Sequence, residues 1–205
     1  MLTAFTASLL LVTAAEFGDK TFFVAVLLAM RHSRRVVFVG VWAALILMTL
    51  LSVFAGQVLS LLPQVYVHYG EIILFVFFGL KLLYEASQMS VCTKNAEAQE
   101  AEELVDCAEL KLPKRQTQLA ILREAFTLTF VAEWGDRTQI TTIALAASYF
   151  QAGVIAGSII GHGICTAIAV VGGRLLAKRI SERTITMLAG FLYLIFAGVA
   201  GLEGR

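Results

Sequence analysis

Two short stretches of the sequence place carboxylates beside a glycine, a basic residue and a threonine within otherwise apolar surroundings. Residues 16–21 read EFGDKT and residues 133–138 read EWGDRT, so the same pattern of residue types recurs at an offset of 117 positions. An ionisable side chain at bilayer depth costs about 2.5–3.5 kcal/mol on insertion scales, which makes such groups rare unless they have a function. These two motifs are therefore the leading candidates for a functional site.

The four acids of the motifs predict a binding site for a divalent cation. Within each motif the two acids are three residues apart, a spacing that puts them on nearly the same face of a helix. The predicted ligands are Glu16, Asp19, Glu133 and Asp136. A divalent cation such as Ca²⁺ takes six or more oxygen ligands. Because the motifs hold no Cys, Met or His, hard ions such as Mn²⁺, Ca²⁺ or Mg²⁺ are favoured over Cu⁺ or Zn²⁺.

The glycines and threonines of the motifs each have two interpretations. Gly18 and Gly135 either let a neighbouring helix approach closely or let their own helix open, so that backbone carbonyls join the ligands. The hydroxyls of Thr21 and Thr138 either bind the cation or return a hydrogen bond to a carbonyl of the preceding turn. In both interpretations these residues support a cation site.

Several other polar residues are predicted to assist the acids. Lys20 and Arg137 are expected either to pair with a carboxylate when no cation is bound or to extend toward the membrane surface. Gln139 follows the second motif where the first has Phe22, which predicts an asymmetric site. His162 is either a proton relay or a hydrogen-bonding partner between helices.

Crowding of the acids predicts competition between metal and protons. Carboxylates in a dry site repel one another when ionised, so at least one is expected to hold a proton when no metal is bound. A dication that enters the site favours the ionised form and displaces that proton. Such competition is the minimum requirement for antiport by alternating access. The alternative is that the two clusters are buried ion pairs that only fix helix packing.

The elements around the motifs are predicted to be membrane helices. The chain has 205 residues, of which 59% are hydrophobic, and a mean hydropathy of +0.81. At 1.5 Å per residue, six apolar segments are long enough to cross a hydrocarbon layer of about 30 Å, the first with a tilt or a break. They cover approximately residues 3–30, 36–61, 70–88, 119–148, 152–177 and 184–202. The net charge of +1 gives no reason to expect a nucleic-acid partner.

A hydrophilic acidic linker, residues 89–117, separates a first segment, 1–88, from a second, 118–205. We interpret the linker as a soluble tether rather than a short helix, because charge runs are usually solvated. The connections after the first, third and fifth spans are rich in Lys and Arg, whereas those after the second and fourth have none. The positive-inside rule therefore places the linker in the cytosol and both termini on the outer face.

The two segments are predicted to be inverted copies of one three-helix unit. At the offset of the motifs, Gly40 matches Gly157 and Gly56 matches Gly173. Because three crossings is an odd number, the second copy enters the membrane from the opposite side, and a pseudo-two-fold axis brings the two motifs together near the midplane. The predicted fold class is an all-α integral membrane protein with six transmembrane helices arranged as two inverted three-helix repeats.

Two copies of E-x-G-D-[KR]-[ST] in a duplicated six-span chain resemble a known family. The sequence is similar to small cation/proton exchangers, within the lysine-exporter superfamily, that export manganese from bacteria and supply manganese or calcium to the Golgi and chloroplast. Residues 161–162, 165–166 and 172–174 also resemble the second repeat of that family. The resemblance implies that the four motif acids bind the transported cation, with the motif threonines as neighbours, and that the chain is a bacterial member.

The predicted function is export of a divalent cation from the cytosol in exchange for protons, with Mn²⁺ as first candidate and Ca²⁺ as second. The chain is not expected to be an enzyme or to hold a resident cofactor, since the metal is substrate and H⁺ is the coupling ion. It is placed in the bacterial inner (plasma) membrane with the lipid bilayer as its partner, and homo-oligomerisation is left open. An intramembrane acid-dyad hydrolase and a passive cation channel remain as alternatives.

Overall fold

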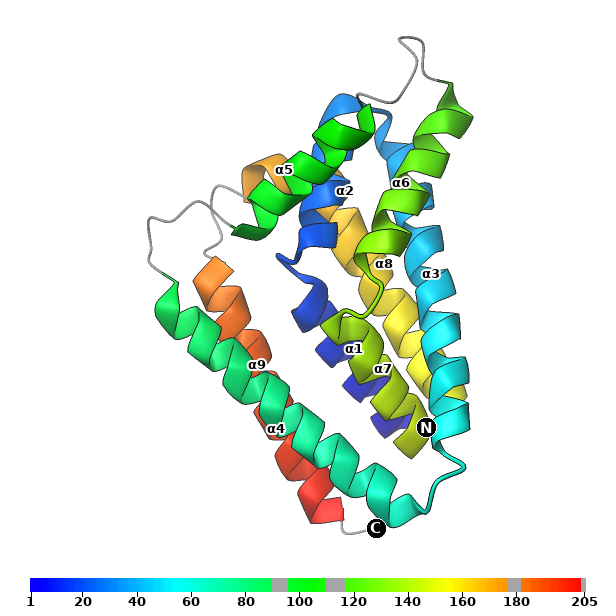
Figure 1. The fold of residues 1–205 in the computed structure, drawn as a ribbon, viewed down its shortest axis with the longest axis vertical. Helices are drawn as coiled ribbons and strands as arrows, with labels where there is room; N and C mark the ends of the chain where they lie inside the picture. The colour runs from blue at the N-terminus through cyan, green and yellow to red at the C-terminus, as the bar shows by residue number, and fades with distance from the viewer. Residues whose placement is uncertain (90–95, 110–116, 177–181, 204–205) are drawn as a thin grey trace.

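A computed structural model describes residues 1–89, 96–109, 117–176 and 182–203. Within these residues the chain forms nine helices and no strand, which confirms the predicted all-helical class (Figure 1). The helices are α1 (Leu2–Glu16), α2 (Lys20–Arg31), α3 (Arg34–Leu59), α4 (Gln64–Gln88), α5 (Ala96–Glu109), α6 (Gln118–Ala132), α7 (Arg137–Ser148), α8 (Gln151–Leu176) and α9 (Glu182–Glu203). Parts of the predicted linker, 90–95 and 110–116, and of the basic connection, 177–181, lie outside the described residues.

Four of the described helices are long and apolar enough to cross a membrane. They contain the segments Arg34–Leu59, Gln64–Gln88, Gln151–Gly172 and Arg183–Leu202. The helix α1 is also apolar but shorter. The outward faces of the four long helices carry many large apolar side chains, which a lipid phase would cover. These features are those of a multi-pass membrane protein.

The first and fourth predicted spans are each divided into two helices. Residues 3–30 form α1 and α2, and residues 119–148 form α6 and α7, so each span opens at the motif glycine. Gly18 and Gly135 both have φ of 82°, in the left-handed region that ends a helix and that L side chains rarely adopt. Of the two interpretations of these glycines, opening of their own helix is therefore confirmed at both positions, while ligation by backbone carbonyls stays a prediction.

Small residues allow the helices around these breaks to pack with their backbones in contact. The helix α1 lies along α8, and α3 lies against α6 and α7, while α4 lies along α9 (Figure 1). A Cβ atom at Gly40 would stand 2.8 Å from the carbonyl oxygen of Leu122 on α6, and one at Gly157 would overlap Ser8 and the carbonyl of Phe5 on α1. Close backbone packing of this kind is typical of membrane helices.

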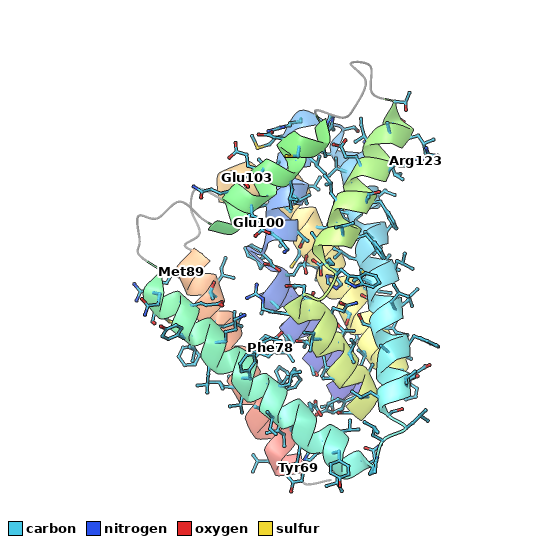
Figure 2. The ribbon with its side chains drawn as sticks, viewed as in Figure 1. Tyr69, Phe78, Met89, Glu100, Glu103 and Arg123 are labelled. Carbon is cyan, nitrogen blue, oxygen red and sulfur yellow. The ribbon has the colours of Figure 1, made fainter. Side chains whose placement is uncertain are left out.

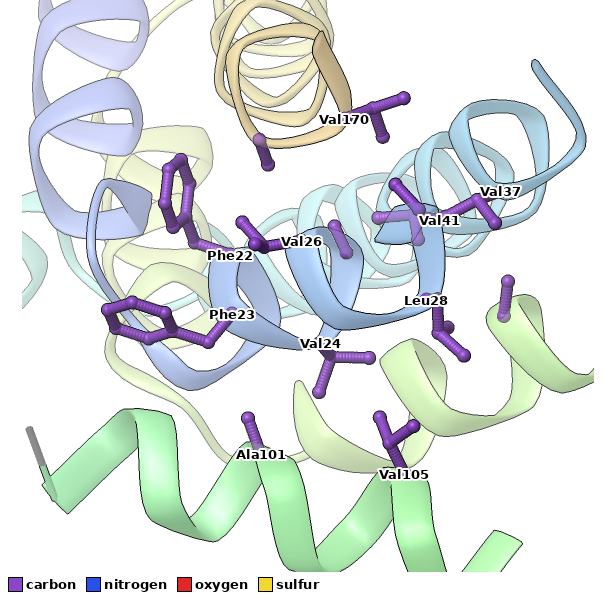
Figure 3. Packing of buried hydrophobic residues seen from close by; sticks show 14 of the residues in the cluster. Phe22, Phe23, Val24, Val26, Leu28, Val37, Val41, Ala101, Val105 and Val170 are labelled. Carbon is purple, nitrogen blue, oxygen red and sulfur yellow. The ribbon is translucent and has the colours of Figure 1, made fainter. Parts of the chain in front are cut away.

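Part of the acidic linker is a docked helix, so its interpretation as a soluble tether was wrong for residues 96–109. Ala101 and Val105 lie four residues apart on one face of α5 and are fully buried. They pack against α2 beside Val24 and Leu28 (Figure 3). The linker therefore adds a helix that rests on the half-helix following the first motif.

Candidate cation site

Each motif straddles one of the two helix breaks. Glu16 is the last residue of α1 and Asp19 is the N-cap of α2, while Glu133 is the C-cap of α6 and Asp136 is the N-cap of α7. The acids of one motif are therefore not on one continuous helix face, and the expectation that they would be was wrong. Instead, backbone bonds of 3.2 Å from Asp19 N to Glu16 O and 3.1 Å from Asp136 N to Glu133 O close two similar turns.

The structure brings the two motifs together. Asp19, Glu133 and Asp136 each present a carboxylate oxygen such that the three atoms lie within 4.8 Å of one another. Asp19 and Glu133 are 4% and 2% exposed, and Asp136 is half-buried. One acid of the first motif and two of the second thus form a compact cluster, which we call the three-acid cluster. Oxygen atoms at this separation suit a shared hard cation.

Glu16, the fourth predicted ligand, is also buried but has different neighbours. Thr21 Oγ1 donates to its Oε1 atom at 2.5 Å. His162 is buried as well, and its Nδ1 atom lies 3.5 Å from the Oε2 atom of Glu16. His162, which the sequence left as either a relay or a packing residue, therefore lies directly against one of the predicted ligands.

The motif threonines bind carboxylates rather than backbone carbonyls. Thr138 Oγ1 lies 2.9 Å from Glu133 Oε2 and 3.2 Å from Asp136 Oδ2. Thr21 makes the equivalent bond to Glu16. Each hydroxyl thus joins the glutamate at the end of one half-helix to the start of the next half-helix. The carbonyl alternative is not what these two hydroxyls do.

The two basic residues of the motifs have different partners. Arg137 Nη2 lies 3.1 Å from Asp19 Oδ1, so a cation of the second motif pairs with an acid of the first. Lys20 Nζ lies 3.7 Å from Glu100 Oε1 on α5. Carboxylate pairing within the site therefore holds for Arg137, whereas Lys20 forms its ion pair with the linker helix.

Gln139 and Phe22, which follow the two motifs at matching positions, make different contacts, as the predicted asymmetry requires. Gln139 Oε1 accepts a hydrogen bond of 2.7 Å from the backbone N–H of Gly135 and so caps the second turn. At the corresponding place in the first half, the ring of Phe22 packs on that of Phe17, with centroids 4.9 Å apart. A polar contact supports one break and an aromatic contact supports the other.

A cavity of about 340 Å³ reaches the three-acid cluster. Its walls come from both motifs, from α4 and from α5. The lining residues are Asp19, Lys20, Phe78, Lys81, Glu85, Glu100, Gly135, Asp136, Arg137 and Ile140. Two of these lining residues, Phe78 on α4 and Glu100 on α5, are labelled in Figure 2. Two acids of the cluster, Asp19 and Asp136, therefore share this cavity with charged residues of α4 and α5.

Sequence reasoning missed Glu100 because it assigned the whole linker to a tether. The signal was present in the spacing of Ala101 and Val105, which are small apolar residues one helical turn apart among acids. It also missed Tyr193, a fully buried residue of α9 whose hydroxyl lies 2.7 Å from Thr141 Oγ1 on α7. A buried tyrosine in an apolar span has no local signal for its partner.

Comparison with known proteins decides the family. The family described as "Divalent cation/proton antiporter GDT1" matches residues 4–90 and 121–205. The chain belongs to the GDT1 family. It is 52% identical over 200 residues to the GDT1-like protein sll0615 of Synechocystis, a match that covers 98% of this chain and 97% of the relative. No solved structure matches the chain.

Two plant proteins extend the comparison. GDT1-like protein 3 of Arabidopsis thaliana is 44% identical over 197 residues, which cover 93% of this chain and 67% of the relative. The chloroplastic protein PAM71-homolog of Arabidopsis thaliana is 40% identical over 210 residues, which cover 95% of this chain and 58% of the relative.

Membership of the GDT1 family has consequences for the alternatives left open by the sequence. Its members are cation transporters and not enzymes, so the intramembrane acid-dyad hydrolase is wrong.

The matched ranges contain both motifs, but they omit residues 91–120 and with them all of α5. The resemblance stated from the motifs is confirmed, and the linker helix lies outside the part of the chain that matches the family.

Proposed function

We propose that the chain exports a divalent cation from the cytosol in exchange for protons, with the cation held between the two broken helices. The observation that carries this proposal is the three-acid cluster, in which buried carboxylates of both motifs approach within 4.8 Å. Like charges at this separation in dry surroundings need compensation. A doubly charged ion supplies it, and Glu16 completes the set of four acids.

The donor set supports a hard cation. The three-acid cluster offers carboxylate oxygens only, which favours Mn²⁺, Ca²⁺ or Mg²⁺ over softer ions. The helices α1 and α6 also end at the site, so their last carbonyls present partial negative charge there. Mn²⁺ is our first candidate and Ca²⁺ the second, because both accept flexible oxygen ligation.

Proton exchange follows from the same carboxylates. When the dication leaves, uncompensated acids in a dry cavity bind protons instead, since two or more adjacent ionised carboxylates repel each other. Thr21 and Thr138 each hold one glutamate in place by a hydrogen bond. A site that carries either one dication or protons couples their movements in opposite directions.

Alternating access is the transport mode that we propose, through two inverted repeats. In this scheme the pair α1 and α2 makes one crossing of the membrane, and the pair α6 and α7 makes another. With α3, α4, α8 and α9 the chain then has six crossings. Support comes from the equal φ of 82° at Gly18 and Gly135 and from helix pairing, since α1 on α8 corresponds to α6 on α3. We further propose that α5 lies in the cytosol, with both termini on the outer face of a bacterial plasma membrane.

The test is transport by the purified full-length protein in liposomes that enclose a pH-sensitive dye. Adding Mn²⁺ outside is expected to raise the internal pH, because each ion that enters drives protons out. Glu133→Gln, which removes an acid of the three-acid cluster, is expected to abolish the signal, while Glu102→Gln on the exposed face of α5 retains it.

Two results would contradict the proposal. Entry of Mn²⁺ without any change of internal pH would indicate a passive channel. Absence of both Mn²⁺- and Ca²⁺-dependent proton movement, in protein with a cooperative thermal transition, would exclude exchange of either ion. Comparing the two ions in the same vesicles also gives their order of preference.

A further inference from the structure

The two motifs carry equivalent cations whose partners are not equivalent. Arg137 crosses to Asp19 of the other motif, where the pair is 20% and 3% exposed. Lys20 occupies the matching position of the first motif, and the matching partner would be Asp136. Instead Lys20 pairs with Glu100 on α5, where the two side chains are 26% and 57% exposed. Within the described residues Asp136 accepts hydrogen bonds from Thr138 and takes part in no ion pair.

Asp136, Glu100 and the two basic residues of the motifs all surround the same cavity. Lys20, Glu100, Asp136 and Arg137 all line it. Lys20 directly follows Asp19 at the start of α2, and its long flexible side chain is able to turn either toward α5 or toward the acids. An ammonium group beside Asp136 would compete with a dication for the same carboxylate. The direction taken by Lys20 therefore affects cation binding.

The helix α5 is held in a fixed place from which it can direct Lys20. Ala101 and Val105 are fully buried against α2. The next residue of α5, Asp106, forms an ion pair with α2, with its Oδ1 atom 2.7 Å from Arg31 Nη1. Glu100 immediately precedes the buried Ala101 and faces the cavity. Its carboxylate is thus presented to Lys20 by a docked helix rather than by a mobile tether.

We propose that Glu100 is a positioning residue of the cation site, which draws Lys20 away from Asp136 and so leaves this acid available to the cation. This inference rests on the proposed function and adds to it a role for the linker helix. Arg137 forms its ion pair with Asp19 and acts on Asp136 only by charge at longer range, so within the described residues Asp136 has no protein cation in ion-pair contact in this conformation. Loss of Glu100 releases Lys20 toward Asp136.

The experiment compares Glu100→Gln with the matched variant Asp106→Asn in the full-length protein. Both substitutions remove an acid of α5 that pairs with a base of α2, but only Glu100 lines the cavity. Because an exposed ion pair is weak, E100Q is expected to raise the KM for Mn²⁺ by about two- to fivefold at nearly constant maximal rate. D106N is expected to keep the wild-type KM, and Glu100→Asp to restore most of the loss.

A double variant decides whether Glu100 acts through Lys20. In a Lys20→Met background, E100Q is expected to cause no further rise of KM, since no ammonium remains to be released. An equal rise in both backgrounds would show that Glu100 only attracts cations by its charge, and would overturn the inference. Equal effects of E100Q and D106N would overturn it too, because docking of α5 would then be the cause.

A second readout does not depend on transport. Labelling of Lys20 in the detergent-solubilised protein by a water-soluble amine reagent, followed by mass spectrometry, is expected to fall about two- to fivefold in E100Q and to stay unchanged in D106N. Unchanged labelling in E100Q contradicts the inference even where Mn²⁺ exchange is observed. Reduced labelling in a protein that exchanges no Mn²⁺ contradicts the proposed function and leaves the positioning of Lys20 in place.

Discussion

The turn at Gly18 and the turn at Gly135 have the same backbone conformation, but their side chains have different partners. Both glycines have φ of 82°, and in both turns a threonine binds the glutamate five residues before it. Around the first turn Glu16 contacts His162, whereas around the second turn Glu133 belongs to the three-acid cluster. Equal motifs therefore produce equal turns and an unequal site.

The difference arises from what packs on each half-helix. The half-helix α2 is covered by α5, whereas α7 lies against α3 and α4. Lys20 consequently finds a carboxylate outside the two motifs, and Arg137 finds one within them. A linker helix that occurs once in the chain thus gives the basic residues of two matching motifs different partners.

The largest expected effect separates the two glutamates. Glu133→Gln is expected to weaken Mn²⁺ binding by about 100-fold or more, because it removes a ligand from the three-acid cluster. Glu16→Gln is expected to weaken it by about tenfold, because Glu16 is held by Thr21 and lies beside His162. Calorimetric titration of Mn²⁺ into the purified variants measures both values. Equal losses would show that the two glutamates contribute equally and would remove this difference between the turns.

The next effect concerns the two basic residues. Arg137→Gln is expected to lower the free energy of unfolding by about 2–3 kcal/mol, because the buried Asp19 loses the guanidinium beside it. Lys20→Gln is expected to change it by less than about 1 kcal/mol, because the pair with Glu100 is exposed to solvent. Thermal unfolding in detergent, followed by circular dichroism, provides the comparison. A larger loss for Lys20→Gln would reverse our ranking of the two ion pairs.

The smallest effect tests what the two turns share. Gly18→Ala and Gly135→Ala are each expected to cost about 1–2 kcal/mol, because an L side chain is strained at φ of 82° although there is space for a methyl group. Gly70→Ala is the matched control, since its added Cβ, like that at Gly135, meets nothing within 4 Å, while that at Gly18 makes only an ordinary contact of 3.9 Å with Ile185, and the backbone of Gly70 is helical. The same unfolding experiment applies. A cost at only one of the two glycines would mean that the turns are less alike than their backbones indicate.

The sequence by itself determined the apolar spans and the residue types that the two motifs offer to a site. Length and apolar composition identify the spans because burial in lipid requires about 20 apolar residues in a row. The position of Gly18 and Gly135 between two acids predicted an opened helix as one of two outcomes, since glycine alone adopts a positive φ without strain. The residue types of the motifs also predicted a hard divalent cation as ligand.

Only the tertiary structure decided which charged groups pair and which acids share the cluster. The pairing of Arg137 with Asp19, the contact of Glu16 with His162 and the reach of Lys20 to Glu100 join residues that are distant in the chain. Such contacts depend on how helices from separate segments pack, and no local periodicity encodes that packing. For α5, the spacing of Ala101 and Val105 marks an apolar face in the sequence, but only the tertiary structure shows that α2 covers this face.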